Sequence, residues 1–357
     1  MESDTILENR PFHIAFCANE RFFPGLAVSL HSALLNITKG LGVKVYIVDA
    51  GLSDESKSSL CARYINRPEI EIEFLDWPRK LFKNVKVVNY HISSYLRLSL
   101  PELLDVKHLL YLDSDTIVFD DISKILAELK ASPHPLAASP DWETKSPAQD
   151  SALIAKHAGV EHCDTYFNAG VLTLDLEALR DERFASRACK LLSELGDHAS
   201  YADQSAFNAL LAERWYELGK EWNTPSWAFD KQLENKLPSI LHYTNSAPWL
   251  TRKYTPAQAL FERIARDLDV DLPRPETSLP QSCVNAVILW LISPLRFFFH
   301  LWREASIWIK EGGDTDRRSL NIAVYWFEYF IYGPIKIVRY WIRIRMINNP
   351  SFSIFTG

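Results

Sequence analysis

The chain reads Leu109-Leu110-Tyr111-Leu112-Asp113-Ser114-Asp115-Thr116-Ile117-Val118, an apolar run of strand length with two carboxylates at its carboxyl end. In an extended backbone, residues i and i+2 point to the same side, so we expect Asp113 and Asp115 to hold one hard cation between them. Without a cation the two carboxylates would repel each other, and the pKa of one would rise. Oxygen ligands suit Mg²⁺ or Mn²⁺, and ligands bind at the carboxyl ends of strands in open α/β sheets. The stretch therefore predicts a divalent cation, serving a phosphate or diphosphate, at such a strand end.

Two other interpretations of this pair stay open at this point. It could form an ordinary polar turn after a strand, because a single Asp-x-Asp is weak support for a metal site. It could also belong to an aspartyl-nucleophile phosphohydrolase, which likewise places Asp-x-Asp after an apolar strand. Those enzymes usually have Thr or Val four residues after the first Asp, where this chain has Ile117, and usually carry the pair on an early strand.

Strand-like and helix-like runs alternate through the first half of the chain. We predict strands at 12–17, 43–49, 70–75, 108–112 and 166–174, and helices at 25–35, 54–64 and from 203 to 211. Ser53 is a candidate N-cap for the second of these helices. The segment 215–248 is predicted to be irregular. The alternation predicts an α/β fold with a mostly parallel sheet flanked by helices.

Charge and cysteine usage limit the class of protein. The formal net charge is −6, but residues 283–357 carry nine Lys/Arg and five Asp/Glu, which leaves 30 basic and 40 acidic residues in the remainder. An acidic body argues against nucleic acid as a partner. The five cysteines are scattered and odd in number, without a Cys-x-x-Cys motif, so they are interpreted as free thiols in a reducing compartment. The polar N-terminus shows no signal segment.

The C-terminal part differs in character from the body. We predict a main domain at 1–266, a proline-rich linker at 267–282 and a helical, aromatic and basic tail at 283–357. Two apolar segments of the tail, 284–302 and 322–347, approach the length of a membrane span.

Charges fall inside both apolar segments, which is unfavourable for a membrane span. Near the end of the second, Lys336, Arg339 and Arg343 share one face of a predicted helix and apolar residues share another. This pattern is typical of a helix lying in an anionic membrane surface. An amphipathic helix packed on the body and a true span are the alternatives.

Three later stretches can complete a site around the two aspartates. Tyr166-Phe167-Asn168-Ala169-Gly170-Val171 places an amide and small residues at a strand start, where a ligand can approach the backbone closely. Tyr201-Ala202-Asp203-Gln204-Ser205 places an acid and an amide at a helix start, although Asp203 could be a plain N-cap. Leu241-His242-Tyr243 offers an imidazole, which in isolation is more often structural than a ligand.

In this order and at these spacings the blocks resemble glycosyltransferase family 8, the retaining family of bacterial lipooligosaccharide galactosyltransferases and glycogenin. The resemblance runs from about Phe12 to about Leu260. It includes Phe16-Cys17-Ala18-Asn19-Glu20 on the first strand, Val48-Asp49-Ala50-Gly51-Leu52-Ser53 after the second, and Ser94-Tyr95-Leu96-Arg97-Leu98. The tail is similar in character to the basic, aromatic tail of the bacterial members.

The resemblance implies a GT-A type nucleotide-sugar fold with a Rossmann-like N-terminal half. It implies a donor site in which Ala18 and Asn19 lie beside the uracil and Ser114 contacts the donor. The donor sugar would be surrounded by Arg97, Asp141, Asn168, Ala169 and Asp203, with Gln204 beneath the anomeric carbon. The ligands of Mn²⁺ or Mg²⁺ would be Asp113, Asp115 and His242. Gln204, Asp203 and Arg97 are the residues expected to take part in catalysis. An amide is a poor nucleophile, so Gln204 favours same-face attack over double displacement.

One departure from the family pattern concerns the late histidine. Members commonly read His-[aromatic]-x-Gly-x-x-Lys-Pro-Trp, whereas this chain reads His242-Tyr243-Thr244-Asn245-Ser246-Ala247-Pro248-Trp249. The stretch is one residue shorter and lacks the Lys that usually contacts the diphosphate, which removes a charge-assisted contact. Arg252 or Lys253 could substitute for it.

The sequence thus predicts a metal-dependent retaining glycosyltransferase that moves glucose or galactose from a UDP-sugar to a lipooligosaccharide, capsule or other glycolipid acceptor. The expected location is cytoplasmic, peripheral on the inner face of the cytoplasmic membrane. A catalytically impaired member that binds nucleotide-sugars or glycans is the first alternative, and the phosphohydrolase is the second.

Overall fold

The computed structural model of the chain describes most of its first 272 residues. The described residues are 11–87, 91–142, 155–156, 165–196, 199, 201–232, 236–244, 247–250, 255–272, 345 and 347. The predicted tail apart from residues 345 and 347, most of the predicted linker, and Asn245, Ser246, Arg252 and Lys253 lie outside this part of the chain.

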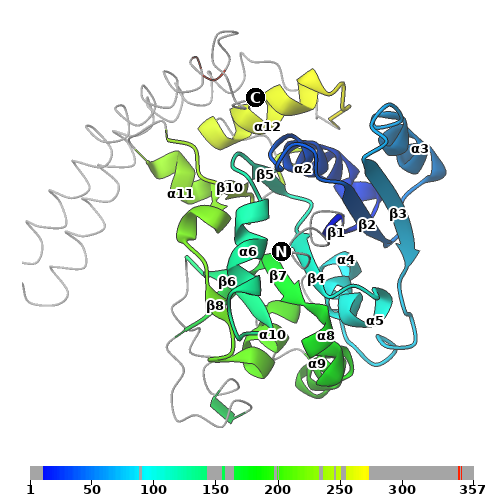
Figure 1. The fold of residues 1–357 in the computed structure, drawn as a ribbon, viewed down its shortest axis with the longest axis vertical. Coiled ribbons are helices and arrows are strands. Elements are labelled where there is room, and N and C mark those ends of the chain that lie inside the picture. The colour runs from blue at the N-terminus through cyan, green and yellow to red at the C-terminus, as the bar shows by residue number, and fades with distance from the viewer. Residues whose placement is uncertain are drawn as a thin grey trace, which may run out of the picture. The chain divides into compact units, whose positions relative to one another are not determined.

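Among the described residues, a large mixed sheet of seven strands forms the centre of the fold (Figure 1). From one edge to the other its strands are β3 (Ile70–Asp76), β2 (Val43–Asp49), β1 (Phe12–Ala18), β4 (His108–Leu112), β7 (Phe167–Asp175), β6 (Leu136–Pro140) and β8 (Tyr216–Glu217). Only β7 runs against its neighbours β4 and β6, and the other pairings are parallel. The predicted mostly parallel sheet is confirmed, and each predicted strand matches an observed one to within one residue at either end.

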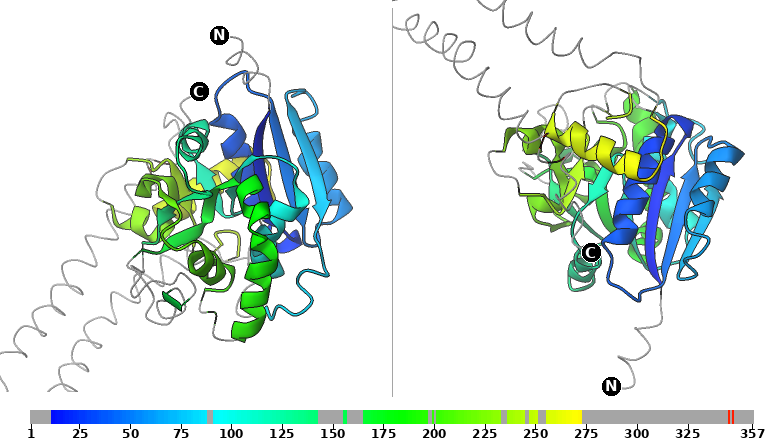
Figure 2. Two further views of the ribbon diagram at one scale, coloured as in Figure 1. Left: turned by 60° about the horizontal axis from the view of Figure 1, so that its bottom comes forward. Right: turned by 90° about the horizontal axis from the view of Figure 1, so that it is seen from above.

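Helices cover both faces of this sheet (Figure 2). They are α2 (Phe23–Leu35), α3 (Asp54–Ala62), α4 (Ile92–Tyr95), α5 (Leu100–Leu103), α6 (Ser123–Lys130), α8 (Leu176–Asp181), α9 (Phe184–Leu195) and α10 (Asp203–Leu211). Helix α11 (Ser226–Lys231) instead contacts the short strands β9 (Thr224–Pro225) and β10 (Ile240–His242). Ser53 caps α3 as predicted, because its side chain accepts a hydrogen bond from the Ser56 N–H at 3.1 Å.

The core follows from the alternation of side chains along the strands. On β1, Ala15 and Cys17 join a buried cluster with residues of α8, α9 and α10, whereas the buried Ile14 and Phe16 point to the opposite face. On that opposite face α2 contacts β1, and α6 contacts β4, β6 and β7. Because both faces are covered, the central strands are apolar almost without interruption.

The order of the strands marks the place where a ligand can bind. From β1 the chain builds outward through β2 and β3, and then returns to add β4 on the other side of β1. Such a reversal opens a crevice at the carboxyl ends of the two strands that flank it. Here these ends are Ala18 on β1 and Leu112 on β4, and Asp113 directly follows the latter.

A second, three-stranded sheet continues from this point. Its order is β5 (Thr116–Val118), β10 (Ile240–His242) and β9 (Thr224–Pro225). β10 pairs antiparallel with β5 and parallel with β9, so that His242 lies opposite both Thr116 and Pro225. The prediction of an irregular segment at 215–248 is therefore wrong in part, because short strands and α11 lie within it.

The described residues fall into two compact units. The large sheet, the small sheet and the helices named above belong to the first, which also contains residues 264–271. The second contains residues 248–263, where the rings of Trp249 and Phe261 pack together in a tilted arrangement with centroids 5.3 Å apart. Helix α12 (Pro256–Asp267) extends through the division between them. Among the described residues, no helix is both long enough and apolar enough to cross a membrane.

Candidate metal and nucleotide-sugar site

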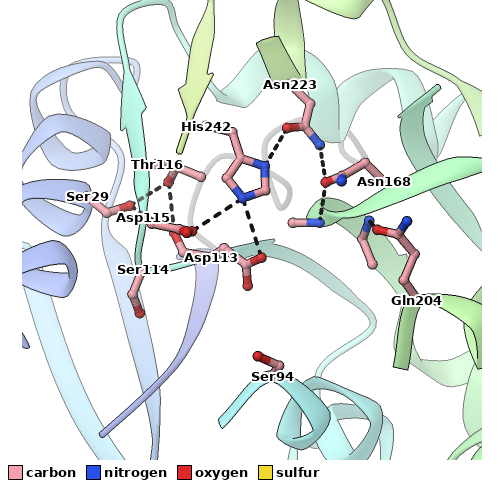
Figure 3. Close-up of polar contacts among 12 residues, drawn as sticks. Ser29, Ser94, Asp113, Ser114, Asp115, Thr116, Asn168, Gln204, Asn223 and His242 are labelled. Carbon is pink, nitrogen blue, oxygen red and sulfur yellow. Dashed lines mark hydrogen bonds and ion pairs between the residues drawn. The ribbon is translucent and has the colours of Figure 1, made fainter. Parts of the chain in front are cut away.

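Three potential metal ligands converge at the junction of the two sheets. One ligand atom each from Asp113, Asp115 and His242 can be chosen so that all lie within 4.8 Å of one another. His242 Nε2 is 3.3 Å from Asp115 Oδ1 and 3.7 Å from Asp113 Oδ2 (Figure 3). The imidazole is buried and the two carboxylates are about one fifth exposed. The structure therefore brings the three predicted metal ligands together.

The two aspartates converge for a different reason from the one predicted. Strand β4 ends at Leu112 and β5 begins at Thr116, so Asp113-Ser114-Asp115 form a turn rather than an extended strand. Ser114, between them, donates a hydrogen bond to the Cys17 carbonyl of β1 at 3.2 Å. The side chain of the middle residue is thereby tied to β1, while its neighbours face His242.

A hydrogen-bond chain orients the imidazole. The Nδ1 atom of His242 lies 2.8 Å from Asn223 Oδ1, and Asn223 Nδ2 donates to Asn168 Oδ1 at 2.9 Å (Figure 3). With its proton on Nδ1, the ring directs its Nε2 lone pair to the side of the two carboxylates, where a cation would accept it. An outer partner on the second ring nitrogen is the usual arrangement for a metal-binding histidine.

The neutral form of His242 binds a metal, whereas the apo site favours the charged form. Burial acts to lower the pKa of His242, but the carboxylates of Asp115 and Asp113 outweigh it and raise the pKa. Burial raises the pKa of Asp113, and the neighbouring Asp115 adds to that effect. A divalent cation would neutralise the repulsion between the two carboxylates. Two carboxylate oxygens with one imidazole nitrogen are a ligand set that suits Mn²⁺ or Mg²⁺.

The backbone of β7 approaches this cluster so closely that only glycine fits. A Cβ at Gly170 would lie 2.1 Å from His242 Cε1 and 2.9 Å from Asp113 Oδ2. The Asp113 N–H also donates to the Gly170 carbonyl at 2.8 Å. The donor set, the oriented ring and this close approach all fit a bound divalent cation.

A buried arginine occupies the other side of Asp113. The Arg97 guanidinium lies 3.0 and 3.1 Å from the two Asp113 oxygens, and the Tyr111 hydroxyl donates to Asp113 Oδ1 at 2.6 Å. Burial acts to lower the pKa of Arg97, but Asp113 and Asp203 outweigh it, so Arg97 stays charged. The arginine also donates to the Ala169 carbonyl. It thus links the aspartate turn to β7.

Asp203 is not the plain N-cap that its position allowed. It is the first residue of α10, and the N-cap position belongs to Ala202, which has a positive φ of 54°. Asp203 Oδ2 lies 3.0 Å from Arg97 Nε as an ion pair. The Nε hydrogen bond goes to the Ser94 carbonyl instead, so this buried oxygen has no hydrogen-bond donor. Burial raises the pKa of Asp203 to about 7.

A network of amides lies between Asp203 and the metal ligands. Gln204 Oε1 accepts from the Ala169 N–H at 3.0 Å, and its Nε2 donates to Asp141 Oδ2 at 3.3 Å. The same Asp141 oxygen accepts from Asn168 Nδ2 at 3.3 Å, and Asn168 Oδ1 also accepts from the Gly170 N–H. Both ends of the Gln204 amide are therefore held in place.

Ala18 is the last residue of β1, and Asn19 directly follows it. Ala18 is buried, and its carbonyl accepts from the Ala50 N–H at 2.8 Å. Asn19 Oδ1 is shielded from solvent and has no hydrogen-bond partner. Such an atom can accept a hydrogen bond from a ligand that enters beside the strand.

Sequence reasoning missed Asn223, Tyr111 and Asn208. Asn223 ends a short 3-10 helix in the segment predicted to be irregular. Asn208 braces the site from α10, where its side chain bonds both the N–H and the carbonyl of Phe167 at 2.9 Å. Tyr111 lies within the apolar run that precedes the aspartates. Of these three residues, only Tyr111 could have been found from the sequence, because its i+2 spacing from Asp113 places both side chains on the same side of an extended strand.

The sequence profile of the family described as "Glycosyl transferase family 8" matches residues 13–253. The chain belongs to glycosyltransferase family 8. Three proteins illustrate the likeness. The chain is 30% identical to general stress protein A of Bacillus subtilis over 258 residues, which are 66% of this chain and 87% of that protein. It is 27% identical to the lipopolysaccharide 1,2-glucosyltransferase of Escherichia coli, over 66% of this chain and 72% of that enzyme.

A solved structure, the galactosyltransferase LgtC in complex with donor and acceptor sugar analogues, shares the fold. It superimposes with a TM-score of 0.61 and 22% identity, over 74% of this chain and 98% of that chain. The α/β fold of GT-A type is thereby confirmed. The family membership supports a glycosyltransferase and argues against the phosphohydrolase alternative.

Proposed function

We propose that the protein is a metal-dependent, retaining hexosyltransferase that uses a UDP-sugar, with glucose or galactose as the transferred sugar. The observation that carries the proposal is the convergence of Asp113, Asp115 and His242 at the reversal point of the sheet. The acceptor is proposed to be a lipooligosaccharide, capsule or other glycolipid. The E. coli relative, by its name a lipopolysaccharide glucosyltransferase, supports this class.

Asp113, Asp115 and His242 would hold Mn²⁺ or Mg²⁺. When bound, a divalent cation supplies Lewis-acid stabilisation of the charge that develops on a departing nucleoside diphosphate. No strongly basic residue is then needed beside the reacting carbon. Arg97, through its hold on Asp113, keeps one carboxylate in place whether or not the cation is present.

Two buried oxygens that lack a hydrogen-bond donor support the proposal of a nucleotide-sugar. Asn19 Oδ1 can accept the imide N–H of a uracil placed at the end of β1, beside Ala18. Asp203 Oδ2 can accept a sugar hydroxyl, and each contact would satisfy an atom that is otherwise buried at a cost of about 1–3 kcal/mol. Ser114 is proposed to lie against the donor beside the two aspartates.

The remaining predicted residues are proposed to bind and orient the donor sugar. Asn168, Ala169 and Asp141 would line its pocket, and Gln204 would lie beneath the anomeric carbon. The Gln204 amide is held by Ala169 and Asp141. Because it carries no negative charge, it is a poor nucleophile and is not expected to bond covalently to the sugar. We therefore favour attack of the acceptor on the face from which the diphosphate departs.

A second candidate is a family member that binds nucleotide-sugars or glycans with impaired turnover. The observation that favours it is the missing Lys in the stretch from His242 to Trp249. The three potential metal ligands lie together and the Gln204 amide is held at both ends, so we rank this candidate below an active transferase.

A donor panel separates these possibilities. We expect UDP-glucose or UDP-galactose, but not GDP- or CMP-sugars, to raise the melting temperature, and to do so only with Mn²⁺ or Mg²⁺. The same donor should be hydrolysed slowly to UDP, and Asp115→Asn should abolish both effects. Metal-dependent stabilisation without UDP release, even with acceptor present, would support the binding protein. A response to none of the UDP-sugars would contradict the proposed donor.

We also propose peripheral attachment to the inner face of the cytoplasmic membrane through the basic, aromatic tail 283–357, with the main domain at 1–266 and a linker at 267–282. Each basic residue near an anionic surface contributes about 1 kcal/mol. Changing Lys336, Arg339 and Arg343 together to Gln in the full chain should therefore release it from anionic vesicles at lower salt. Retention of the triple variant under alkaline washing would indicate a span instead.

A further inference from the structure

Two tryptophans lie next to the candidate site and are not explained by the donor. Trp142 directly follows Asp141, whose carboxylate accepts from Asn168 and Gln204. Trp227 lies two residues after Pro225, the strand partner of His242. The two indole rings meet edge to face, with centroids 6.3 Å apart and an interplanar angle of 89°. An aromatic pair is thus positioned beside the residues assigned to the donor.

A lysine covers one face of each ring. Lys220 Nζ lies 5.3 Å from the centroid of Trp142, and Lys231 Nζ lies 4.7 Å from that of Trp227. Both lysines are exposed. Within the part of the chain that the structure describes, neither of them forms an ion pair with a carboxylate. Two ammonium groups without a neighbouring carboxylate beside the same pair of rings are unusual in this chain, because its body carries more acidic than basic residues.

The indole nitrogens of both tryptophans lack partners. Nε1 of Trp142 and Nε1 of Trp227 are shielded from solvent and make no hydrogen bond. An indole N–H usually finds an acceptor when it is buried, and one left without an acceptor calls for an explanation. Unused donors, unpaired ammonium groups and aromatic faces together suit a ligand that is rich in oxygen and negatively charged.

We propose that Trp142, Trp227, Lys220 and Lys231 form an acceptor subsite for a sugar that carries an anionic group, either a phosphate or a carboxylate. The inference rests on the proposed transferase function and narrows its acceptor class. The apolar face of the sugar packs against indole. Ring oxygens or hydroxyls accept from the two Nε1–H groups, and the anionic group pairs with the ammonium groups that already lie above the rings.

The test measures binding of small acceptor analogues to the full-length protein in the presence of saturating UDP and Mg²⁺, which occupy the nucleotide and metal part of the donor site. Glucose, glucose 6-phosphate and glucuronate are compared by ligand-observed NMR titration. We expect the wild type to bind at least one of the anionic sugars roughly tenfold more tightly than glucose, the size that two exposed ion pairs can supply. The better of the two identifies phosphate or carboxylate as the anionic group.

Variants assign the preference to the four residues. The double variant Lys220→Gln/Lys231→Gln should lose the preference while its weak binding of glucose stays unchanged. Trp142→Ala and Trp227→Ala should weaken the binding of all three sugars, and the corresponding Phe variants should restore part of it. The matched control is Lys190→Gln, an exposed lysine on α9 that pairs with Glu194, and it should keep the wild-type preference.

Failure of the subsite and failure of the proposed function give different results. A wild type that binds UDP with Mg²⁺ but binds glucose and the anionic sugars equally would overturn the subsite alone. Persistence of the preference in the double lysine variant would do the same. Absence of metal-dependent UDP binding in the wild type would instead overturn the proposed function on which the subsite rests.

Discussion

The large sheet and the small sheet of the first unit hold their parts of the candidate site in different ways. Asp113 follows β4, a buried strand of five residues, and its backbone N–H is bonded to Gly170 on the adjacent β7. His242 ends β10, a strand of three residues beside the two-residue β9. The aspartate turn is therefore anchored by the core of the fold, whereas the strand that carries the imidazole is short and has few backbone hydrogen bonds to its neighbours.

The small sheet compensates with side-chain contacts. Asn223 holds the His242 ring, and Thr116, opposite His242, donates to the Asp113 carbonyl at 2.9 Å and bonds Ser29 at 2.7 Å (Figure 3). The difference teaches that one side of the site is set by sheet architecture and the other by a few polar contacts. Substitutions on the two sides should then fail in different ways, which the following experiments test.

The largest effect is expected from the aspartates, and it should separate Asp113 from Asp115. Asp113→Asn and Asp115→Asn should each lower metal-supported turnover by more than about 100-fold, because ligand loss should exceed the effect of losing an outer partner. Stability without metal should differ. Asp113→Asn deprives the buried Arg97 of one of two carboxylates, so its free energy of unfolding should fall by up to about 3 kcal/mol.

Asp115→Asn should leave that stability unchanged or raise it, because it removes a carboxylate that repels Asp113. Denaturant unfolding in EDTA measures both variants. Equal losses of stability would show that Asp113 is no more anchored than Asp115, which would remove the contrast between the two sides. Wild-type turnover in either variant would remove the metal proposal.

Gly170→Ala tests whether the core side sets the spacing of the cluster. The new Cβ would lie 2.1 Å from His242 Cε1 and must push the ring away from the carboxylates. We expect the affinity for Mn²⁺, measured by isothermal titration, to fall at least about tenfold. Gly42→Ala is the matched control, because its Cβ would meet no atom closer than 3.9 Å. Similar affinities of the two variants would show that the cluster adapts freely.

The same contrast explains how much the sequence could predict. β1, β2 and β4 are buried and long enough to carry an apolar signal, and their observed ends agree with the prediction to within one residue. β9 and β10 are two and three residues long, and they exist because distant segments pair with them. No local pattern marks such strands, so the position of His242 over the aspartates came from the family resemblance alone.

Asn223 shows the same limit at the level of one side chain. Its neighbours Trp222 and Thr224 give no periodic signal, and its role depends on the approach of His242 and Asn168 from other elements. The prediction that Asp113 and Asp115 lie together is confirmed, but they lie in a turn and not, as predicted, in an extended strand. Ser114 explains this, because its bond to β1 turns the middle side chain away.

Asn223→Ala tests the polar side directly. Loss of the partner of Nδ1 should lower the Mn²⁺ affinity and turnover by about 10–100-fold, the usual effect of removing an outer partner of a metal-binding histidine. Asn223→Asp keeps an acceptor for Nδ1–H but loses the donor to Asn168, so it should retain most of the metal affinity. If Asn223→Ala and Asn223→Asp weaken Mn²⁺ binding equally, the ring is oriented by something other than this contact.

The smallest expected effect concerns Asp203, on the core side of the site. Its folded-state pKa of about 7 lies above the usual value of 3.8. Its contribution to stability is therefore fully present below pH 4 and is lost as the pH rises to 7. Relative to Asp203→Asn, the wild type should lose unfolding free energy between pH 5 and pH 8, by a few kcal/mol at most, since one pKa unit is worth about 1.4 kcal/mol.

Urea unfolding at several pH values in EDTA, with the two proteins compared at each pH, isolates this difference. Asp49→Asn is the control. Burial of Asp49 is outweighed by hydrogen bonds from Leu52, Lys57 and Gly51, so its pKa is lowered and its difference from wild type should not change between pH 5 and pH 8. A pH-independent difference for Asp203→Asn as well would mean that Arg97 keeps Asp203 ionised throughout. The Asp203 oxygen, which pairs with Arg97 but lacks a hydrogen-bond donor, would then act as a permanent anion toward the sugar hydroxyls, rather than as a group that charges near neutral pH.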